Sequence, residues 1–478
     1  MTRRGAEVQI GHFTLKRPLG EGGMAEVWLA EHAGSGDVFA IKLMRSDLVQ
    51  DALLRARFLT EAKTIASLHH PNIVKLYDVG TTSVDVELGE GVIQAGTPYY
   101  AMEYYPQGTL RDCLSRLSWS TLKHYLLILL DALAAAHARG LVHRDLKPSN
   151  ILMGRWGPVV SDFGIVFNMN DVSQDNEAGL TGTPSYMAPE QFREHTRSFG
   201  PWTDLYALGC LTYWLCTKRP PFQCGNFHEL VANHLRIPPA PLSPHFAVPQ
   251  SFLDWVSRCL AKDMNARPQL AADAAHDLVR LSGPFIQSVC PPESVVHTGD
   301  DLEPTLLSQN ALFSQTEDGV AVPLRGGRLI RVGLSWHRPG DFVPVVAKPS
   351  LGLGMVSIAQ PPLVGRMPER DLLWHRLIAS LQKGLRVVSI TGESGVGKSA
   401  LMEWFGHRAH TVGAALPLLL SHSLDSEGGD GIPGMLKREM RAMGLSGNEL
   451  LEHLALYCKR YGIEADEKAL LSCIVPQA

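Results

Sequence analysis

The stretch HRDLKPSN at residues 143–150 and the stretch SDFG at residues 161–164 decide how this chain is interpreted. Between them lies the short apolar run ILM, which predicts a strand joining two polar loops. Phosphoryl transfer needs a carboxylate to receive the proton of the attacking hydroxyl, oxygen ligands for Mg²⁺, and a cation near the transferred group. The two loops contain all three kinds of group.

Each polar residue of these loops suits one of those tasks. Asp145 can act as the base, and Lys147 can stabilise charge that develops on the transferred group. Asn150 and Asp162 can supply oxygen ligands to the metal. A solvated surface loop would explain the first stretch by itself, but it would not explain SDFG one short strand later.

A glycine-rich stretch lies upstream, where LGEGGMAEV at residues 19–27 joins two predicted strands. Residues without a Cβ atom let backbone N–H groups approach phosphate oxygens. The following strand carries Ala40 and Lys42, which share one of its faces because they are two residues apart. From that face Lys42 can reach phosphates beneath the loop. The alternative is a simple turn followed by an exposed strand lysine.

Glu61 lies on the apolar face of a helix predicted from Leu48 to Leu68. A carboxylate on a buried face needs a partner, and Lys42 is the natural candidate. Such a pair would hold the ammonium group on a nucleotide. The alternative is a surface contact between Glu61 and Arg57, one helical turn away, worth a few tenths of a kcal/mol.

Taken in order, GEGGMAEV, AIK, Glu61, HRDLKPSN, DFG and MAPE resemble the eukaryotic-like Ser/Thr protein kinase family as it occurs in bacteria. The resemblance covers roughly residues 12 to 283 and implies an α+β two-lobed protein kinase fold, with a small β-rich N-terminal lobe and a larger α-helical C-terminal lobe. It implies catalytic roles for Lys42, Glu61, Asp145 and Lys147, and metal binding by Asn150 and Asp162. The ATP-binding residues that it implies are Leu19, Gly20, Glu21, Gly22, Gly23, Val27, Ala40, Lys42, Met102, Glu103, Tyr105, Asn150 and Asp162.

The same resemblance assigns structural roles. It makes Met102 the residue before an adenine-binding hinge that runs from Glu103 to Tyr105. It implies that Asp204 braces the catalytic loop and that Glu190 pairs with Arg267.

Two features depart from the family pattern. Ala25 stands where a third glycine often lies, a change that its small side chain should allow. The segment 81–97 is longer than usual, and we predict a variable loop there without an assigned function.

The activation segment after DFG holds the candidate regulatory residues Thr181 and Thr183. Thr181 is the expected phosphorylation site, and Arg144 is a cation that could receive its phosphate. The resemblance implies that Thr183 instead contacts Asp145 and Lys147. The alternative is that neither threonine is modified.

A second phosphate-binding motif, GESGVGKS, follows a predicted strand VVSIT and precedes a predicted helix ALMEWF. Backbone N–H groups would surround phosphates, with a lysine reaching them and a serine hydroxyl on Mg²⁺. The segment resembles the AAA-type signalling ATPase domains that follow kinase domains in some bacterial regulators. No acidic residue ends a later strand, so we expect a partial P-loop α/β unit that does not hydrolyse ATP. Its predicted nucleotide-binding residues are Gly392, Gly395, Gly397, Lys398 and Ser399.

Composition and patterning divide the chain into four parts: a tail (1–11), a kinase domain (12–283), a Pro/Gly-rich linker (284–360) and the partial P-loop segment (361–478). The formal charge is −4 without a polybasic run, which argues against nucleic-acid or membrane-surface binding. The most apolar segment is too short to span a bilayer, and the eight cysteines are scattered. We therefore expect a cytoplasmic protein.

These observations lead to one functional prediction and its alternatives. The chain is expected to use ATP and Mg²⁺ to phosphorylate Ser and Thr hydroxyls of proteins, itself included, in bacterial signal transduction. Its expected partners are protein substrates, and a homodimer for trans-autophosphorylation is left open. The alternative is a nucleotide-sensing scaffold whose kinase-like domain binds without catalysis. The complete set of catalytic residues favours the enzyme, and the segment 361–478 could also be a remnant without a role.

Overall fold

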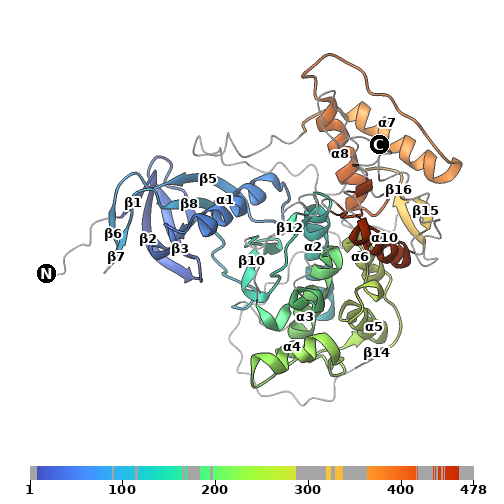
Figure 1. Ribbon diagram of the computed structural model, residues 1–478, viewed down its shortest axis with the longest axis horizontal. Coiled ribbons are helices and arrows are strands. Elements are labelled where there is room, and N and C mark those ends of the chain that lie inside the picture. The colour runs from blue at the N-terminus through green and yellow to red at the C-terminus, as the bar shows by residue number, and fades with distance from the viewer. Residues whose placement is uncertain are drawn as a thin grey trace. The chain divides into compact units, whose positions relative to one another are not determined.

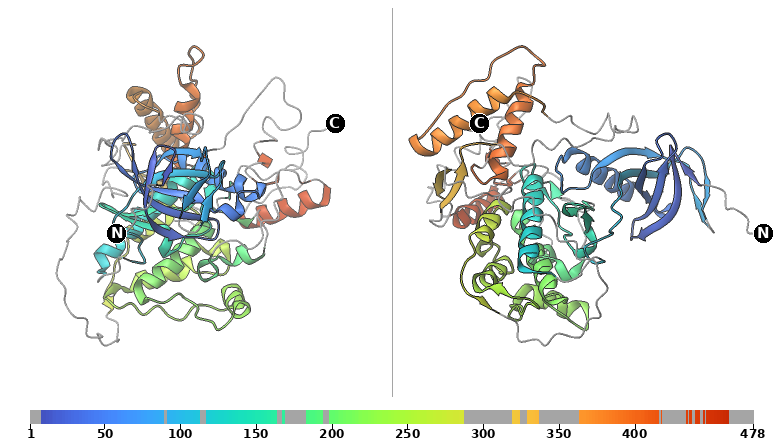
Figure 2. Two further views of the ribbon diagram at one scale, coloured as in Figure 1. Left: turned by 90° about the vertical axis from the view of Figure 1, so that its left-hand side faces the viewer. Right: turned by 180° about the vertical axis from the view of Figure 1, so that it is seen from behind.

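The computed structural model describes residues 8–88, 91–112, 117–163, 167–168, 183–193, 198–286, 319–323, 329–336 and 363–415, together with 417, 434, 436–437, 440–442, 445 and 447–461. Two compact units make up the chain (Figures 1 and 2). The first comprises Met1–Arg116, Pro148–Val166 and Arg338–Val364. The second comprises Leu117–Lys147, Phe167–His337 and Gly365–Ala478.

The first unit is built on an antiparallel sheet, drawn in blue in Figure 1. Its strands, in spatial order, are β1 (Gln9–Ile10), β2 (Phe13–Glu21), β3 (Ala25–His32), β4 (Val38–Met44), β8 (Pro98–Glu103) and β5 (Leu76–Thr81). Alternation along β4 sends Phe39, Ile41 and Leu43 into the apolar core of the sheet. Lys42 therefore lies on the opposite face, as the sequence predicted.

Helix α1 (Ala52–Ser67) carries Glu61 on its buried face. The prediction that this helix begins at Leu48 is wrong by four residues. A 3₁₀ turn, η1 (Ser46–Leu48), comes first, and the Asp51 side chain then accepts hydrogen bonds from the N–H groups of Leu53 and Leu54. That cap fixes the start of the helix.

The segment predicted as a variable loop at 81–97 contains a hairpin of β6 (Val86–Leu88) and β7 (Gly91–Ile93). Ile93 is buried in the core of the sheet, so this segment is part of the packed unit. After it in the first unit come the turn η2 (Pro148–Asn150) and the hairpin of β10 (Ile151–Gly154) and β11 (Gly157–Val160). The predicted ILM strand is thus present as β10.

The second unit is largely helical. Helix α2 (Trp119–His137) is buried along most of its length, and Ser118 caps its start. Among the described residues, no helix combines the length and the apolar character needed to cross a membrane. The remaining elements up to residue 286 are β9 (Leu141–Val142), β12 (Phe167–Asn168), η3 (Pro184–Tyr186), η4 (Pro189–Arg193), α3 (Pro201–Thr217), α4 (Phe227–Arg236), β13 (Val248–Pro249), α5 (Gln250–Cys259), η6 (Met264–Ala266), α6 (Ala271–Val279) and β14 (Phe285–Ile286).

The C-terminal part of the second unit has a small core of its own. The hairpin of β15 (Gly319–Pro323) and β16 (Leu329–Gly333) packs with α7 (Met367–Lys383) and α8 (Lys398–Thr411) around Trp336 and Trp374. Helix α10 (Gly447–Tyr461) follows. The segment predicted as a linker therefore contains strands that pack with the helices after it.

The strand predicted at VVSIT, before the second phosphate loop, is absent from the structure: residues 387–391 are not a strand. Leu385 and Val387 are each 88% exposed, and the described residues contain no strand that pairs with this run. An isolated extended run has no ladder hydrogen bonds to stabilise it. The α/β context expected for this loop is therefore not seen in the described part of the chain.

Candidate functional site

Lys42 is the centre of a charge cluster in the first unit. Its Nζ lies 2.7 Å from Glu61 Oε1 and 2.7 Å from Asp162 Oδ1. Tyr100, opposite Lys42 on β8, donates its hydroxyl to Glu61 Oε1 at 2.9 Å. The expected pair of Lys42 and Glu61 is present, and Tyr100 is a member that the sequence analysis missed.

The two carboxylates keep the ammonium group charged. Burial by itself lowers the pKa of Lys42, but the carboxylate charges of Asp162 and Glu61, together with the Tyr100 hydroxyl, outweigh it, and the pKa lies well above its usual value. Lys42 is thus a permanent cation held at a fixed place on the sheet.

The glycine-rich stretch forms the hairpin between β2 and β3, in which the N–H of Gly22 donates to the carbonyl of Ala25 at 2.8 Å. A Cβ atom added at Gly20 or Gly23 would meet nothing within 4 Å. Packing within the chain therefore does not require these glycines, whereas a ligand lying close to the loop backbone would. Leu19 and Val27 are half-buried beside the loop, and Glu21 is exposed.

The predicted hinge lies at the end of β8. Met102 is buried and pairs across the sheet with Ala40 of β4. The N–H of Glu103 donates to the carbonyl of Lys75 at 3.0 Å, and the hydroxyl of Tyr105 donates to Glu103 Oε2 at 3.2 Å. These contacts fix the backbone of the segment that we predicted to bind adenine.

The two predicted metal ligands are joined through Ser161. Its N–H and its hydroxyl both donate to the carbonyl of Asn150, at 2.9 and 3.0 Å. The next residue, Asp162, has a left-handed backbone with φ of 56°. Such a conformation costs a non-glycine residue free energy and is commonly found at functional sites. Asn150 and Asp162 are thus fixed on neighbouring segments.

The second unit holds Asp145 in a compact group with Lys147 and Thr183. Lys147 Nζ lies 2.7 Å from Asp145 Oδ2 and 2.6 Å from Thr183 Oγ1. The N–H of Thr183 donates to Asp145 Oδ1 at 2.9 Å. The contacts that the family resemblance implied for Thr183 are therefore present.

Asp204 fixes the backbone of the catalytic loop from below the surface. Its two carboxylate oxygens accept hydrogen bonds from the N–H groups of His143 and Arg144, each at 2.8 Å. His137 Nε2 also lies 2.8 Å from Oδ2. Burial alone would raise the pKa of Asp204, but the hydrogen bond and charge of His137 lower it below its usual value. Because the carboxylate is ionised, His137 Nε2 is the donor.

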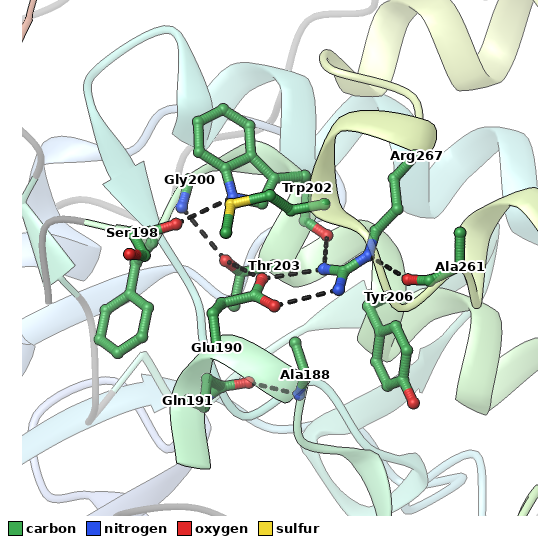
Figure 3. A network of polar contacts seen from close by, with 12 residues as sticks. Ala188, Glu190, Gln191, Ser198, Gly200, Trp202, Thr203, Tyr206, Ala261 and Arg267 are labelled. Carbon is green, nitrogen blue, oxygen red and sulfur yellow. Dashed lines mark hydrogen bonds and ion pairs between the residues drawn. The ribbon is translucent and has the colours of Figure 1, made fainter. Parts of the chain in front are cut away.

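Figure 3 shows the buried ion pair between Glu190 and Arg267. The two guanidinium nitrogens lie 2.8 and 3.0 Å from the two carboxylate oxygens, a bidentate arrangement. The Thr203 hydroxyl donates to Glu190 at 2.9 Å, and Arg267 also donates to the carbonyl of Trp202. This implied pair is present and anchors the end of the activation segment.

The expected phosphorylation site, Thr181, lies outside the described residues. Arg144, its expected cation, is buried, and its guanidinium group lies 4.5 Å from the centre of the Phe199 ring. The pairing of Arg144 with a phosphate stays a prediction.

The second phosphate loop is present as a loop before α8, which begins at Lys398 with Ser399 in its first turn. The Lys398 ammonium group donates to the carbonyls of Gly392 and Glu393, at 2.9 and 2.6 Å. Gly395 and Gly397 have φ of 82° and 89°, which other residues rarely adopt. The loop thus has the positive φ angles that its glycines allow, but no strand precedes it in the described residues.

The sequence model of the protein kinase domain family matches residues 13–279, which is more than half of this chain. The chain therefore belongs to the protein kinase family. It is 36% identical over 278 residues to the probable serine/threonine-protein kinase PknB of Bifidobacterium longum, a match that covers 56% of this chain and 39% of that protein. It is 35% identical over 306 residues to the serine/threonine-protein kinase PknB of Mycobacterium tuberculosis, covering 63% and 46%. The match thus spans less than half the length of these relatives.

Proposed function

We propose that this chain is a Ser/Thr protein kinase of bacterial signalling that uses ATP and Mg²⁺ to phosphorylate proteins, itself included. The observation that carries the proposal is the pairing of Lys42 with Glu61 and Asp162 in the same chain that holds Asp145 against Lys147 and Thr183. A binding scaffold would not require the second group. The resemblance to serine/threonine-protein kinases supports the same reaction.

The residues present fit Mg²⁺ and ATP. Lys42 offers a permanent cation for phosphate oxygens, and the open backbone of Gly20 and Gly23 offers N–H groups. Asn150 and Asp162 offer the oxygen donors that Mg²⁺ prefers. When bound, ATP supplies the phosphoryl group and the metal neutralises its charge.

The chain's own residues handle the acceptor hydroxyl. Asp145 would receive the hydroxyl proton, since its oxygens can each accept another hydrogen bond beside those from Lys147 and Thr183. Lys147 would place positive charge near the transferred group. Asp204 holds the loop backbone while this happens, because it binds the N–H groups of His143 and Arg144.

Labelling with the γ-phosphate of ATP tests the proposal. The purified chain with Mg²⁺ should become phosphorylated on Ser and Thr, and mass spectrometry should locate a phosphate on the activation segment, with Thr181 as the first candidate. Label on Tyr alone, or an unlabelled protein that binds ATP, would contradict it. Dilution of the protein would show whether one copy modifies another.

We further propose that the segment 361–478 is a partial P-loop unit of the AAA type that binds a nucleotide without hydrolysing it, and that 12–283 is the kinase domain. The geometry of Gly395, Gly397 and Lys398 supports nucleotide binding. The packing of β15 and β16 with α7 and α8 supports assigning residues 319–323 and 329–336 to the C-terminal unit as well, instead of to a bare linker.

Lys398→Ala is expected to separate the two nucleotide sites. The number of bound nucleotides should fall from two to one per chain, because the variant removes the phosphate-binding cation of the second loop. The initial rate of autophosphorylation at saturating ATP should stay within about twofold, since the kinase residues lie elsewhere. Equilibrium dialysis with a non-hydrolysable ATP analogue measures the first quantity. Binding of a single nucleotide by the parent chain would refute the second site.

A further inference from the structure

Helix α8 packs against α2, and Figure 1 shows α8 next to one end of α2. The last turn of α8 carries His410, which is only 7% exposed. Burial, the largest cause, together with the proximity of His137 and His407, lowers the pKa of His410 to about 4. His410 is therefore a neutral imidazole close to the C-terminal end of α2.

His137 at that end of α2 is the donor to Asp204, which binds the N–H groups of the catalytic loop. A connection thus runs from α8 to the loop that holds Asp145: α8 packs against α2, whose His137 binds Asp204, and Asp204 binds the backbone of His143 and Arg144. We propose that His410 is a positioning residue that keeps water from the pair of His137 and Asp204 and thereby keeps the catalytic loop firmly held. This inference rests on the proposed kinase function.

The physical reason is the low local dielectric around the pair. Hydrogen bonds to a carboxylate are stronger where water is excluded, and water that enters competes for the same lone pairs. The Nδ1 atoms of His137 and His410 are both buried without a hydrogen-bond partner. Such unsatisfied groups are costly and uncommon in folded proteins, so their presence on two helices that pack together points to a role beyond packing.

Further contacts hold the C-terminal end of α8 against α2 and α6. His276 Nε2 on α6 lies 3.4 Å from the carbonyl of Val412. Arg139, just after α2, interacts with the charge of Glu403 on α8 and lies near His407. The position of His410 is therefore fixed from α2 and from α6.

A second piece of the C-terminal segment reaches the same unit independently. The guanidinium group of Arg441 donates to the carbonyl of Phe199 and lies 5.2 Å from the centre of the Trp202 ring. The ring of Phe199 in turn lies against Arg144 of the catalytic loop. A second contact from the C-terminal segment thus ends beside Arg144 of the catalytic loop.

The first test is His410→Ala in the full chain, with the same change at His375, an exposed histidine of α7, as the matched control. The maximal rate of autophosphorylation should fall about fivefold in His410→Ala, while the KM for ATP stays within about twofold, because the nucleotide-binding residues are untouched. Amide hydrogen exchange at His143 and Arg144 should become about fivefold faster, because their acceptor is less firmly held. His375→Ala should match the parent in all three measurements.

Glu403→Lys tests the same contact without altering the interior, because Glu403 is exposed. It places a like charge near Arg139 and should weaken the packing of α8 against α2. The maximal rate of autophosphorylation should fall about twofold, and amide exchange at His143 and Arg144 should become about twofold faster. Glu449→Lys on α10 has the same change in net charge at an exposed position and is the matched control. This variant decides the question if His410→Ala does not fold.

Equal rates and equal exchange in His410→Ala and the parent would overturn the inference. Faster exchange spread evenly over α2 and α3 would also overturn it, since that pattern means general destabilisation. Failure of the proposed function would look different. A parent chain that transfers no phosphate would refute the kinase, while the exchange at His143 and Arg144 would still decide whether His410 holds the loop.

Discussion

Replacing Asp145 with asparagine is expected to lower the initial rate of autophosphorylation by about a thousandfold. The carboxylate that would receive the hydroxyl proton is lost, and an amide cannot act as a base at neutral pH. The asparagine side chain has nearly the same shape, and its amide oxygen can still accept the hydrogen bond from the N–H of Thr183. The affinity for ATP should therefore stay within about twofold of the parent value, as measured by titration with a fluorescent analogue.

Asp254→Asn is the matched control, because it removes the same charge from an exposed position on α5. It should leave both rate and affinity unchanged. The result also separates the two functional hypotheses: a nucleotide-sensing scaffold predicts that Asp145→Asn is indistinguishable from the parent in phosphate incorporation. Equal labelling of Asp145→Asn and the parent would show that the catalytic assignment is wrong.

The sequence predicted those features of the fold that follow from residues close together in the chain. The position of Lys42 followed from strand alternation with Ala40, and Glu61 followed from its place on an apolar helix face. Glu61 needed a partner on its buried face, and it pairs with Lys42 at 2.7 Å. Predictions of this kind depend on few long-range contacts.

Other features depend on which distant segments pack together, and the sequence could not predict them. Tyr100 was overlooked because its hydroxyl meets Glu61 only through the pairing of β8 with β4. The role of His137 was likewise missed, because it depends on Asp204, far along the chain. The apolar run at VVSIT has the composition of a strand, but a strand forms only where another strand pairs with it.

Lys42→Met is expected to reduce phosphoryl transfer by about a hundredfold or more, because the phosphates lose their fixed cation. The pKa of Lys42 in the folded state is raised above its value in the unfolded state. Its charge therefore contributes stability that is fully present below the unfolded pKa of lysine and is lost as the pH rises through the folded pKa. The loss of activity should therefore be the same from about pH 6 to about pH 9.

The stability of Lys42→Met should also fall, by up to about 3 kcal/mol, because removing one partner leaves a buried carboxylate without its counter-charge. The hydrogen bond that Tyr100 donates to Glu61 limits this cost. Lys16→Met is the matched control: Lys16 lies on β2 of the same sheet and pairs with Glu31 at 3.2 Å, where both side chains are more than a third exposed. Exposed pairs of this kind contribute little, so the control should unfold at the same urea concentration as the parent.

Adding Glu61→Gln to Lys42→Met should recover part of the lost stability without recovering activity, because the buried charge is removed but the cation is not restored. If Lys42→Met folds and transfers phosphate at the parent rate, Lys42 does not serve the reaction, and the cluster with Glu61 and Asp162 is a structural ion pair alone.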